Sequence, residues 1–253
     1  MRLYHVALAT RDASPAIATL VGDLGGTVLF GGESIGFRPM QVYLGDAGSG
    51  MKVEFLEPFG VEQNDFLERF LVRHGGGPHH LTFKVDDLEQ TLDGVRAAGY
   101  TPVSVDLSDP TWKEAFLQPR EAHGTVVQLA ESDHHTTPLD DYAYATKHGA
   151  DANPQWWRDP PLRGEHATTL RRIVLATPSL DDTEEFFSGL LTGEAWSTGD
   201  DPRPWIELAW PGAGRIRLEQ RDDLAPGIDR LELVGPGPPR ELTLARTRFV
   251  INP

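Results

Sequence analysis

An internal repeat constrains the fold of this chain more than any other feature. The segment HVALATRD, from His5 to Asp12, and the segment HLTFKVDD, from His80 to Asp87, each open on a histidine, continue as a β-prone run and reach an aspartate at the same interval. Self-similarity at a fixed spacing is the signature of a repeated structural unit. The chain is therefore expected to fold as copies of one module.

Both copies predict the same order of elements, β-α-β-β-β. In the first, residues 3–10 alternate as a half-buried strand does, apolar residues at helical spacing follow, and Gly25-Gly26 ends the helix. In the second, Asp87 is expected to cap the helix and Gly99 to end it. Glycine-containing turns separate the further strands, predicted at 27–30, 40–44 and 51–56, and again at 101–105, 113–118 and 125–129. This order predicts an α+β fold of tandem βαβββ modules.

The C-terminal part continues the repeat in a degenerate form. A third copy has Arg172 at the histidine position and Ser179 at the helix-cap position, and Glu219 follows Arg172 at close to the interval that separates His5 from Glu54. A fourth copy starts at Arg230, but too few residues follow for a whole module. It is expected to lack its helix and to close with a single strand, 242–251.

A segment of different composition separates the two parts of the chain. Residues 132–166 are polar, contain several prolines and lack hydrophobic periodicity, which is typical of a linker. The predicted organisation is a domain of two modules at 1–131, a linker at 132–166, and a truncated, degenerate domain at 167–253.

The composition narrows the classes of molecule that this protein is expected to bind. The formal net charge of −15 at pH 7 repels phosphate backbones and anionic lipid, so neither nucleic acid nor a membrane surface is expected to bind. The chain has no cysteine, which excludes thiolate ligands and suits a reducing compartment. With no apolar signal region at the N-terminus and no stretch of membrane-spanning length, we expect a cytoplasmic protein.

Four side chains at matching positions of the first two modules form a candidate metal site: His5, Glu54, His80 and Gln128. Successive side chains of a strand face opposite sides, so the four can share one concavity if their strands are in a common register, as the matched spacing predicts. Two imidazoles, a carboxylate and an amide oxygen suit Zn, Fe(II), Mn, Co or Ni. We predict one divalent ion whose identity stays open. The alternative, that the histidines are ordinary polar residues, is weakened by their duplication.

These motifs resemble the vicinal oxygen chelate superfamily, which includes glyoxalase I, methylmalonyl-CoA epimerase, extradiol dioxygenases and the fosfomycin and bleomycin resistance proteins. The resemblance covers residues 1–131. The segments GGGPHHLTFKVDD, AFLQP and GTVVQL are similar to the glyoxalase-like and epimerase-like branch in particular. The resemblance implies cup-shaped mixed sheets, with the metal ligands at the four positions already named.

The resemblance also implies a function, a metal-dependent lyase or isomerase that acts on a small oxygenated or acyl substrate through a metal-stabilised enediolate. The family position of Gln128 is usually a glutamate linked to proton transfer, and an amide cannot act as a base. Glu54 is the one ionisable carboxylate among the ligands and is therefore the predicted catalytic residue. Because the amide lowers the negative charge around the ion, we expect an anionic substrate.

Other functions stay open at this point. Two histidines and a carboxylate also suit a non-haem iron dioxygenase, and the fold also serves non-catalytic small-molecule binding or resistance proteins. Arginine cannot bind a cation, so Arg172 and Arg230 predict an inactive or anion-binding counterpart in the C-terminal half, with the inactive one favoured. The chain is expected to be a monomer or a homodimer.

Overall fold

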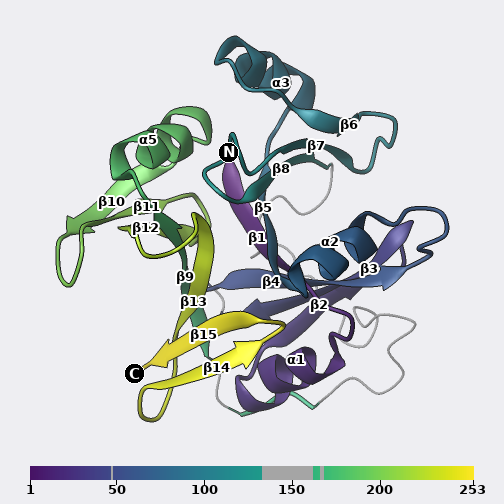
Figure 1. Cartoon of the computed structure of the whole chain (residues 1–253). Coiled ribbons are helices and arrows are strands. Elements are labelled where there is room, and N and C mark those ends of the chain that lie inside the picture. Colours follow the sequence, from purple (N-terminus) through teal and green to yellow (C-terminus); the bar gives the residue numbers. More distant parts are fainter. Residues whose placement is uncertain (47, 133–161, 166–167) are drawn as a thin grey trace. The chain divides into compact units, whose positions relative to one another are not determined.

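The computed structural model describes residues 1–46, 48–132, 162–165 and 168–253. Most of the predicted linker, 132–166, lies outside the described residues. Figure 1 labels the helices and strands along the chain.

The first part of the chain forms an eight-stranded sheet with the strand order β2-β3-β4-β1-β5-β8-β7-β6. Its strands are β1 (Arg2–Ala9), β2 (Thr27–Gly31), β3 (Gly36–Leu44), β4 (Met51–Phe59), β5 (Gly77–Lys84), β6 (Val103–Asp106), β7 (Lys113–Leu117) and β8 (Val126–Glu131). Its helices are α1 (Ser14–Ala18), which continues as the π-helical turn η1 (Thr19–Asp23), α2 (Phe66–His74) and α3 (Leu88–Ala97).

The later part forms a seven-stranded sheet with the order β10-β11-β12-β9-β13-β15-β14. Its elements are β9 (Thr169–Thr177), α5 (Leu180–Glu184) with the π-helical turn η3 (Glu185–Leu190), β10 (Glu194–Gly199), β11 (Trp205–Ala209), β12 (Arg215–Gln220), β13 (Gly227–Val234), β14 (Arg240–Leu244) and β15 (Thr247–Asn252).

The predicted α+β fold of tandem βαβββ modules is confirmed. Three modules have the full order of elements: β1 to β4, β5 to β8, and β9 to β12. In each of them the first strand pairs in parallel with the last, and the last pairs antiparallel with the strand before it. The division into sequence domains at 1–131 and 167–253 stays a prediction.

The end of the chain differs from the single closing strand expected at 242–251. This segment is a hairpin in which β14 and β15 pair antiparallel. Ala245 and Arg246 form its turn with φ angles of 46° and 57°, the left-handed region that a two-residue hairpin turn requires. Glycine or asparagine is the usual signal for such a turn, and neither occurs here. The β-prone pattern runs through the turn without a break, so the sequence predicts one strand where the structure has two.

The helices of the second and third modules start where their caps were predicted. The Asp87 side chain accepts a hydrogen bond from the backbone N–H of Gln90 at the start of α3, and the Ser179 side chain accepts one from Asp182 N–H at the start of α5. Each cap satisfies a backbone donor that the first turn of a helix leaves unpaired. The caps thus set the direction in which the chain leaves β5 and β9.

By packing, the chain divides into two compact units. Among the described residues, the first packing unit comprises Met1–Tyr4, 80–132 and Arg172–Arg230, and the second comprises His5–His79, 162–165, 168–171 and Leu231–Pro253. In the first unit, the rings of Phe83, Phe187 and Trp210 form an aromatic cluster with centroid separations of 5.3, 6.4 and 6.5 Å. Aromatic pairs at such distances add to the stability that their burial provides.

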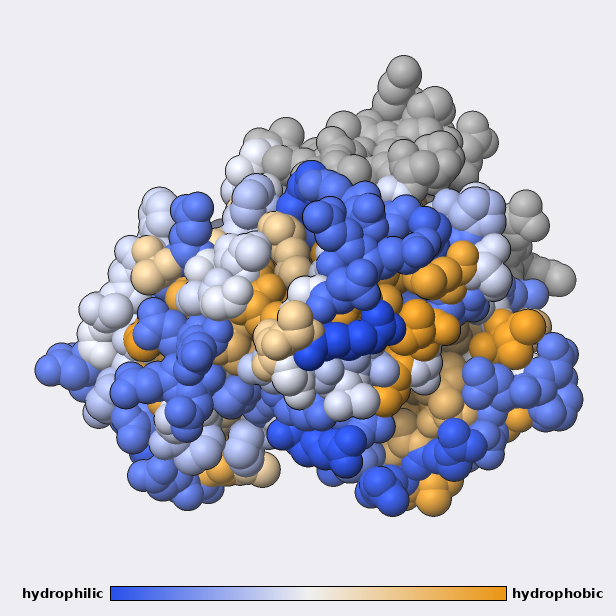
Figure 2. Space-filling view, turned by 90° about the horizontal axis from the view of Figure 1, so that it is seen from above, coloured by the Kyte–Doolittle hydropathy of each residue, from blue (hydrophilic) through white to orange (hydrophobic). Residues whose placement is uncertain are grey.

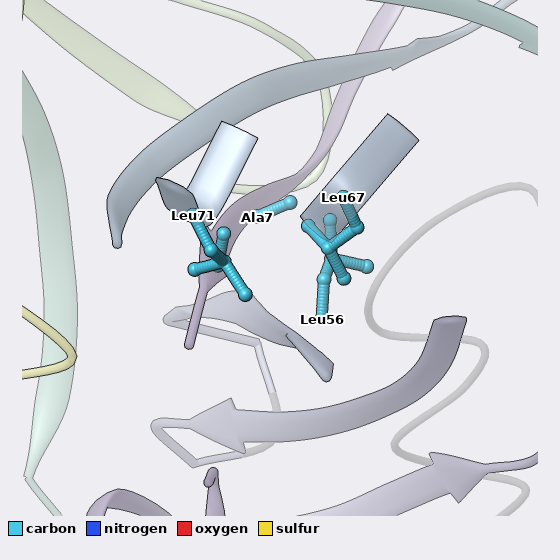
Figure 3. Close-up of a cluster of buried hydrophobic side chains, with 5 residues drawn as sticks. Ala7, Leu56, Leu67 and Leu71 are labelled. Atoms are coloured by element: carbon cyan, nitrogen blue, oxygen red, sulfur yellow. The ribbon is translucent and has the colours of Figure 1, made fainter. Parts of the chain in front are cut away.

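In the second packing unit, helix α2 packs on strands β1 and β4 (Figure 3). Leu67 and Leu71 are one helical turn apart and contact a cluster that includes Ala7 and Leu56. Burying a leucine side chain contributes about 1.5–3 kcal/mol. The α2 packing thus holds together the two strands that carry His5 and Glu54.

The visible surface is mostly hydrophilic, with scattered hydrophobic patches (Figure 2). This agrees with the large net negative charge. Among the helices of the described residues, none is both long enough and apolar enough to cross a membrane.

Candidate metal centre

The second packing unit brings His5 and Glu54 together. β1 and β4 run in parallel with Ala7 opposite Glu54, so the His5 side chain, two residues earlier, faces the same side of the sheet. His5 Nε2 lies 3.2 Å from Glu54 Oε2. The two residues are only 2% and 6% exposed. A buried carboxylate needs partners that offset its charge, and the imidazole is one of them.

Gln41 orients the carboxylate of Glu54 from the neighbouring strand. Gln41 of β3 stands opposite Glu54 in the antiparallel pairing, and its Nε2 donates a hydrogen bond of 2.7 Å to Glu54 Oε1. One oxygen of Glu54 is thus bound to Gln41 while the other faces His5. This arrangement fixes the rotation of the carboxylate, as supporting hydrogen bonds commonly do for metal ligands.

The first packing unit carries His80 and Gln128, again on parallel strands. Thr82 of β5 stands opposite Gln128 of β8, so His80 is two residues before the paired position, as His5 is in the first module. His80 and Gln128 are 5% and 6% exposed. The His80 ring packs edge-on to Phe116, with the ring centroids 6.3 Å apart. The duplicated spacing in the sequence therefore reflects a duplicated strand register.

Hydrogen bonds to two neighbouring side chains fix the orientation of the Gln128 amide. Thr82 Oγ1 donates to Gln128 Oε1 at 2.5 Å, and Gln128 Nε2 donates to Glu114 Oε2 at 2.7 Å. Trp112 Nε1 donates to the same Glu114 oxygen at 2.8 Å. Because a carboxylate only accepts hydrogen bonds, Glu114 selects the amide nitrogen and leaves the oxygen of Gln128 on the other side.

Each of the two modules therefore pairs one carboxylate with one amide, and the strands that carry them are exchanged between the modules. In the first module the carboxylate is on the last strand and the amide on the strand before it; in the second module Gln128 is on the last strand and Glu114 on the strand before it. Sequence reasoning missed both Gln41 and Glu114. A polar residue in the strand preceding each expected oxygen ligand was the signal that could have found them.

His79, the neighbour of His80, has a structural environment. Its ring lies against Phe66 and Phe70, with centroid distances of 6.0 and 4.7 Å. Burial lowers the pKa of His79 to about 4, although the carboxylate of Glu54 acts in the opposite direction. The side chain is therefore neutral at physiological pH.

The third module holds arginines where the first two hold the candidate ligands. Val174 of β9 stands opposite Arg217 of β12, so Arg172 and Arg217 correspond in register to His5 and Glu54. The expectation that Glu219 takes the Glu54 position was wrong by two residues, because intervals along the chain also count loop residues, whereas hydrogen bonding between the strands sets the pairing.

Those two arginines share one buried carboxylate. Arg172 Nη1 and Arg217 Nη2 donate to Glu207 Oε2 at 2.8 and 3.2 Å, and Glu207 is 2% exposed. Glu207 stands opposite Arg217 in the β11–β12 pairing, as Gln41 stands opposite Glu54. Guanidinium groups donate hydrogen bonds and accept none, so this position cannot bind a cation through Arg172 and Arg217.

One part of the chain matches a known family model. Residues 4–116 match the family model described as the Glyoxalase/Bleomycin resistance protein/Dioxygenase superfamily. The matched range is less than half of the chain and includes His5, Glu54 and His80. No curated protein matches the sequence.

A solved structure shares the fold over almost the whole chain, and others match about half of it. A hypothetical protein from Staphylococcus aureus matches 99% of this chain and 98% of its own, with a TM-score of 0.65 and 9% identity. A hypothetical protein from Bacillus halodurans C-125 matches 53% of this chain and 96% of its own, with a TM-score of 0.46 and 23% identity. Methylmalonyl-CoA epimerase from Mycobacterium tuberculosis matches 53% of this chain and 89% of its own, with a TM-score of 0.45 and 23% identity.

Proposed function

We propose that this protein is a metal-dependent enzyme, a lyase or isomerase of the glyoxalase-like or epimerase-like kind, and that it acts on a small oxygenated or acyl substrate. One observation carries the proposal: in the second packing unit the imidazole of His5 lies 3.2 Å from the carboxylate of Glu54, and the first packing unit repeats the same strand register with His80 and Gln128. All four residues are buried. A mixed set of imidazole and carboxylate donors at this spacing fits a divalent transition-metal ion.

Gln128 is the proposed fourth ligand. Its amide oxygen accepts from Thr82 while Glu114 holds the nitrogen on the other side, so oxygen is the donor atom that the residue offers. When bound, the ion would supply Lewis-acid polarisation of a substrate carbonyl and would offset negative charge that develops on its oxygen. The metal's identity stays open because these ligand types accept several ions.

Glu54 is the proposed proton-transfer residue. Gln41 fixes the orientation of its carboxylate, and a positioned carboxylate can take a proton from the carbon next to a carbonyl. Glu114 places a further carboxylate beside Gln128, so the amide at the usual glutamate position does not leave that half of the site without an acidic group.

Metal binding is tested first. Protein purified without chelator is expected to hold a transition metal at one ion per chain by elemental analysis, and His80→Ala is expected to lose it. His74→Ala is the matched control, since His74 is exposed at the end of α2. Unchanged metal content in His80→Ala would show that His80 is not a ligand.

The reaction class is tested by hydrogen exchange. Hydroxy ketones, thiol adducts of 2-oxo aldehydes and acyl thioesters are incubated with the protein in D₂O, and exchange next to the carbonyl is followed by NMR. Exchange that requires metal and is lost in Glu54→Gln supports the proposal. Oxygen uptake with Fe(II) and a catechol would instead indicate a dioxygenase. Tight ligand binding that a chelator leaves unchanged would indicate a binding protein.

Gln128→Glu tests the fourth ligand. The substitution sets a second carboxylate within hydrogen-bonding distance of Glu114, so we expect metal binding to be kept or tightened and an oxalate-like anion to bind more weakly. Metal and anion titrations of both proteins measure these effects. Tighter anion binding by the mutant would remove Gln128 from the ligand set.

A further inference from the structure

A cavity with an unusual lining lies in the third module and extends to the start of β13. Its volume is about 260 Å³, and it lies within the first packing unit. The lining residues are Asp201, Pro202, Arg203, Trp205, Arg217, Glu219, Arg221 and Arg230. Four guanidinium groups therefore share one small cavity in a protein whose net charge is −15.

The alternation of β12 explains why these side chains gather. Ile216 and Leu218 point to the core and are fully buried, so Arg217 and Glu219 point to the opposite face. Trp205 of β11 stands opposite Glu219 and adds an aromatic wall. The Arg217 guanidinium stacks on the Trp205 ring, 3.9 Å from its centroid, and this contact fixes its plane.

Carboxylates orient the other arginines. Arg230 makes a two-pronged pair with Glu219, with distances of 3.0 and 2.6 Å, and its Nη1 also donates to Asp229 Oδ2 at 2.8 Å. Arg221 donates through Nε and Nη2 to Asp223 at 2.8 and 3.0 Å, and Arg203 Nη1 donates to the same carboxylate at 3.1 Å. A guanidinium has five N–H donors in a rigid plane. Toward Asp223, Arg203 donates through Nη1 and Arg221 through Nε and Nη2.

The charge that faces the cavity is positive. Of the carboxylates that bind these arginines, Glu207, Asp223 and Asp229 are outside the lining, whereas the lining itself has four arginines against Asp201 and Glu219. The side chains of Arg217, Arg221 and Arg230 are 16, 17 and 14% exposed, so water screens their charges only in part. Because water screens these guanidinium charges only in part, they attract an anion more strongly than fully exposed arginines would.

We propose that this cavity binds a small oxyanion, a molecule carrying a carboxylate or phosphate group, and that the third module is an anion-binding site and not an inactive remnant. Planar arginine donors match the oxygen geometry of both groups. The volume is below the range typical of drug-sized ligands, so the ligand has few heavy atoms. The proposal is independent of the metal site, because it involves none of the candidate ligands.

The test is isothermal titration with inorganic phosphate and, separately, with malonate. Saturable binding of either probe is expected, and the tighter of the two identifies the group that the cavity prefers. Arg221→Gln and Arg203→Gln are each expected to weaken it by about ten-fold, the usual effect of losing one charge-assisted hydrogen bond. Arg248→Gln is the matched control, because Arg248 is a more exposed arginine that pairs with Glu241 on β14.

Glu219→Gln separates anion binding from a merely structural role. Removing this negative charge from the lining is expected to tighten anion binding several-fold, an outcome that damage to the fold would not produce. Circular dichroism confirms that each variant is folded. The proposal is overturned if neither probe binds at millimolar concentrations, or if binding is the same in wild type, Arg221→Gln and Arg203→Gln.

Discussion

The first and third modules share a backbone arrangement and differ in the charge of the side chains that it positions. In the first, His5 and Glu54 occupy the register positions on the parallel strand pair, and Gln41 supports them from the next strand. In the third, Arg172 and Arg217 occupy those positions, and the supporting residue is a carboxylate, Glu207. The module thus specifies where three side chains meet but not their chemistry.

The difference also shows how each module offsets buried charge. Glu207 has two guanidinium groups of the same module as its cations, so the third module neutralises that carboxylate with its own residues. Glu54 has an imidazole and an amide as its neighbours on the strands of its module, and these are compatible with a bound cation. The proposed metal binding in one module and the proposed anion binding in the other both agree with this inversion.

The largest effect is expected from Glu207→Ala. Removing the carboxylate leaves two arginines facing each other at a nearly buried position, which is expected to lower the free energy of unfolding by about 3–5 kcal/mol. Urea denaturation measures the change. Glu241→Ala removes an exposed partner of Arg248 and is expected to cost less than about 1 kcal/mol. Equal losses in the two variants would contradict the role of Glu207 as a buried counter-charge.

Glu114→Ala tests whether the second module depends on its supporting residue. Without this acceptor the Gln128 amide can rotate, and we expect metal affinity to fall by about 10–100-fold. Competition with a chelating dye measures the affinity. Glu114→Gln keeps an acceptor oxygen and is expected to lose less, whereas Glu89→Gln, in α3, is the control. Identical affinities in Glu114→Ala and wild type would show that Gln128 does not ligate the ion.

Removing the helix caps of the second and third modules allows their contributions to the free energy of unfolding to be compared. Asp87→Ala and Ser179→Ala each remove one cap hydrogen bond and are each expected to cost about 1 kcal/mol. Asp93→Ala, at an exposed position within α3, is the control, with an expected change within about 0.5 kcal/mol. Thermal denaturation of the three variants makes the comparison. A cap variant as stable as this control would show that the cap contributes nothing.

The smallest effect concerns pH and His123. Burial lowers the pKa of His123 below its ordinary value of 6.5, and its Nδ1 lies 3.0 Å from Thr183 Oγ1. As pH falls, His123 therefore takes up a proton in the unfolded chain before it does so in the folded chain. The stability that neutral, buried His123 contributes is present above pH 6.5 and is lost as pH falls through the folded-state pKa.

His123→Asn is the suitable variant because the residue has a φ of 51°, which asparagine tolerates. Between pH 7.5 and 5 its stability is expected to fall less than that of wild type, as measured by urea denaturation at a series of pH values. An equal fall in both proteins would assign the pH dependence to other groups.

Much of the fold follows from local sequence patterns. The sequence predicts the module order, the caps at Asp87 and Ser179, and a matched strand register for His5 with Glu54 and for His80 with Gln128. Each depends on neighbouring residues or on a spacing that recurs within the same chain. Such features are local or repeated, and a single sequence contains enough information to predict them.

Only the tertiary structure decided how the side chains on adjacent strands pair. The contacts of Gln41 with Glu54 and of Glu114 with Gln128, and the presence of Arg217 in place of Glu219 at the ligand position, all depend on cross-strand register. Register is set by hydrogen bonding between strands and by the lengths of the turns that join them, and turn lengths differ between modules. An interval counted along the chain includes the residues of those turns. It therefore identifies the strand that carries a functional residue. It does not identify which residue of that strand stands opposite its partner.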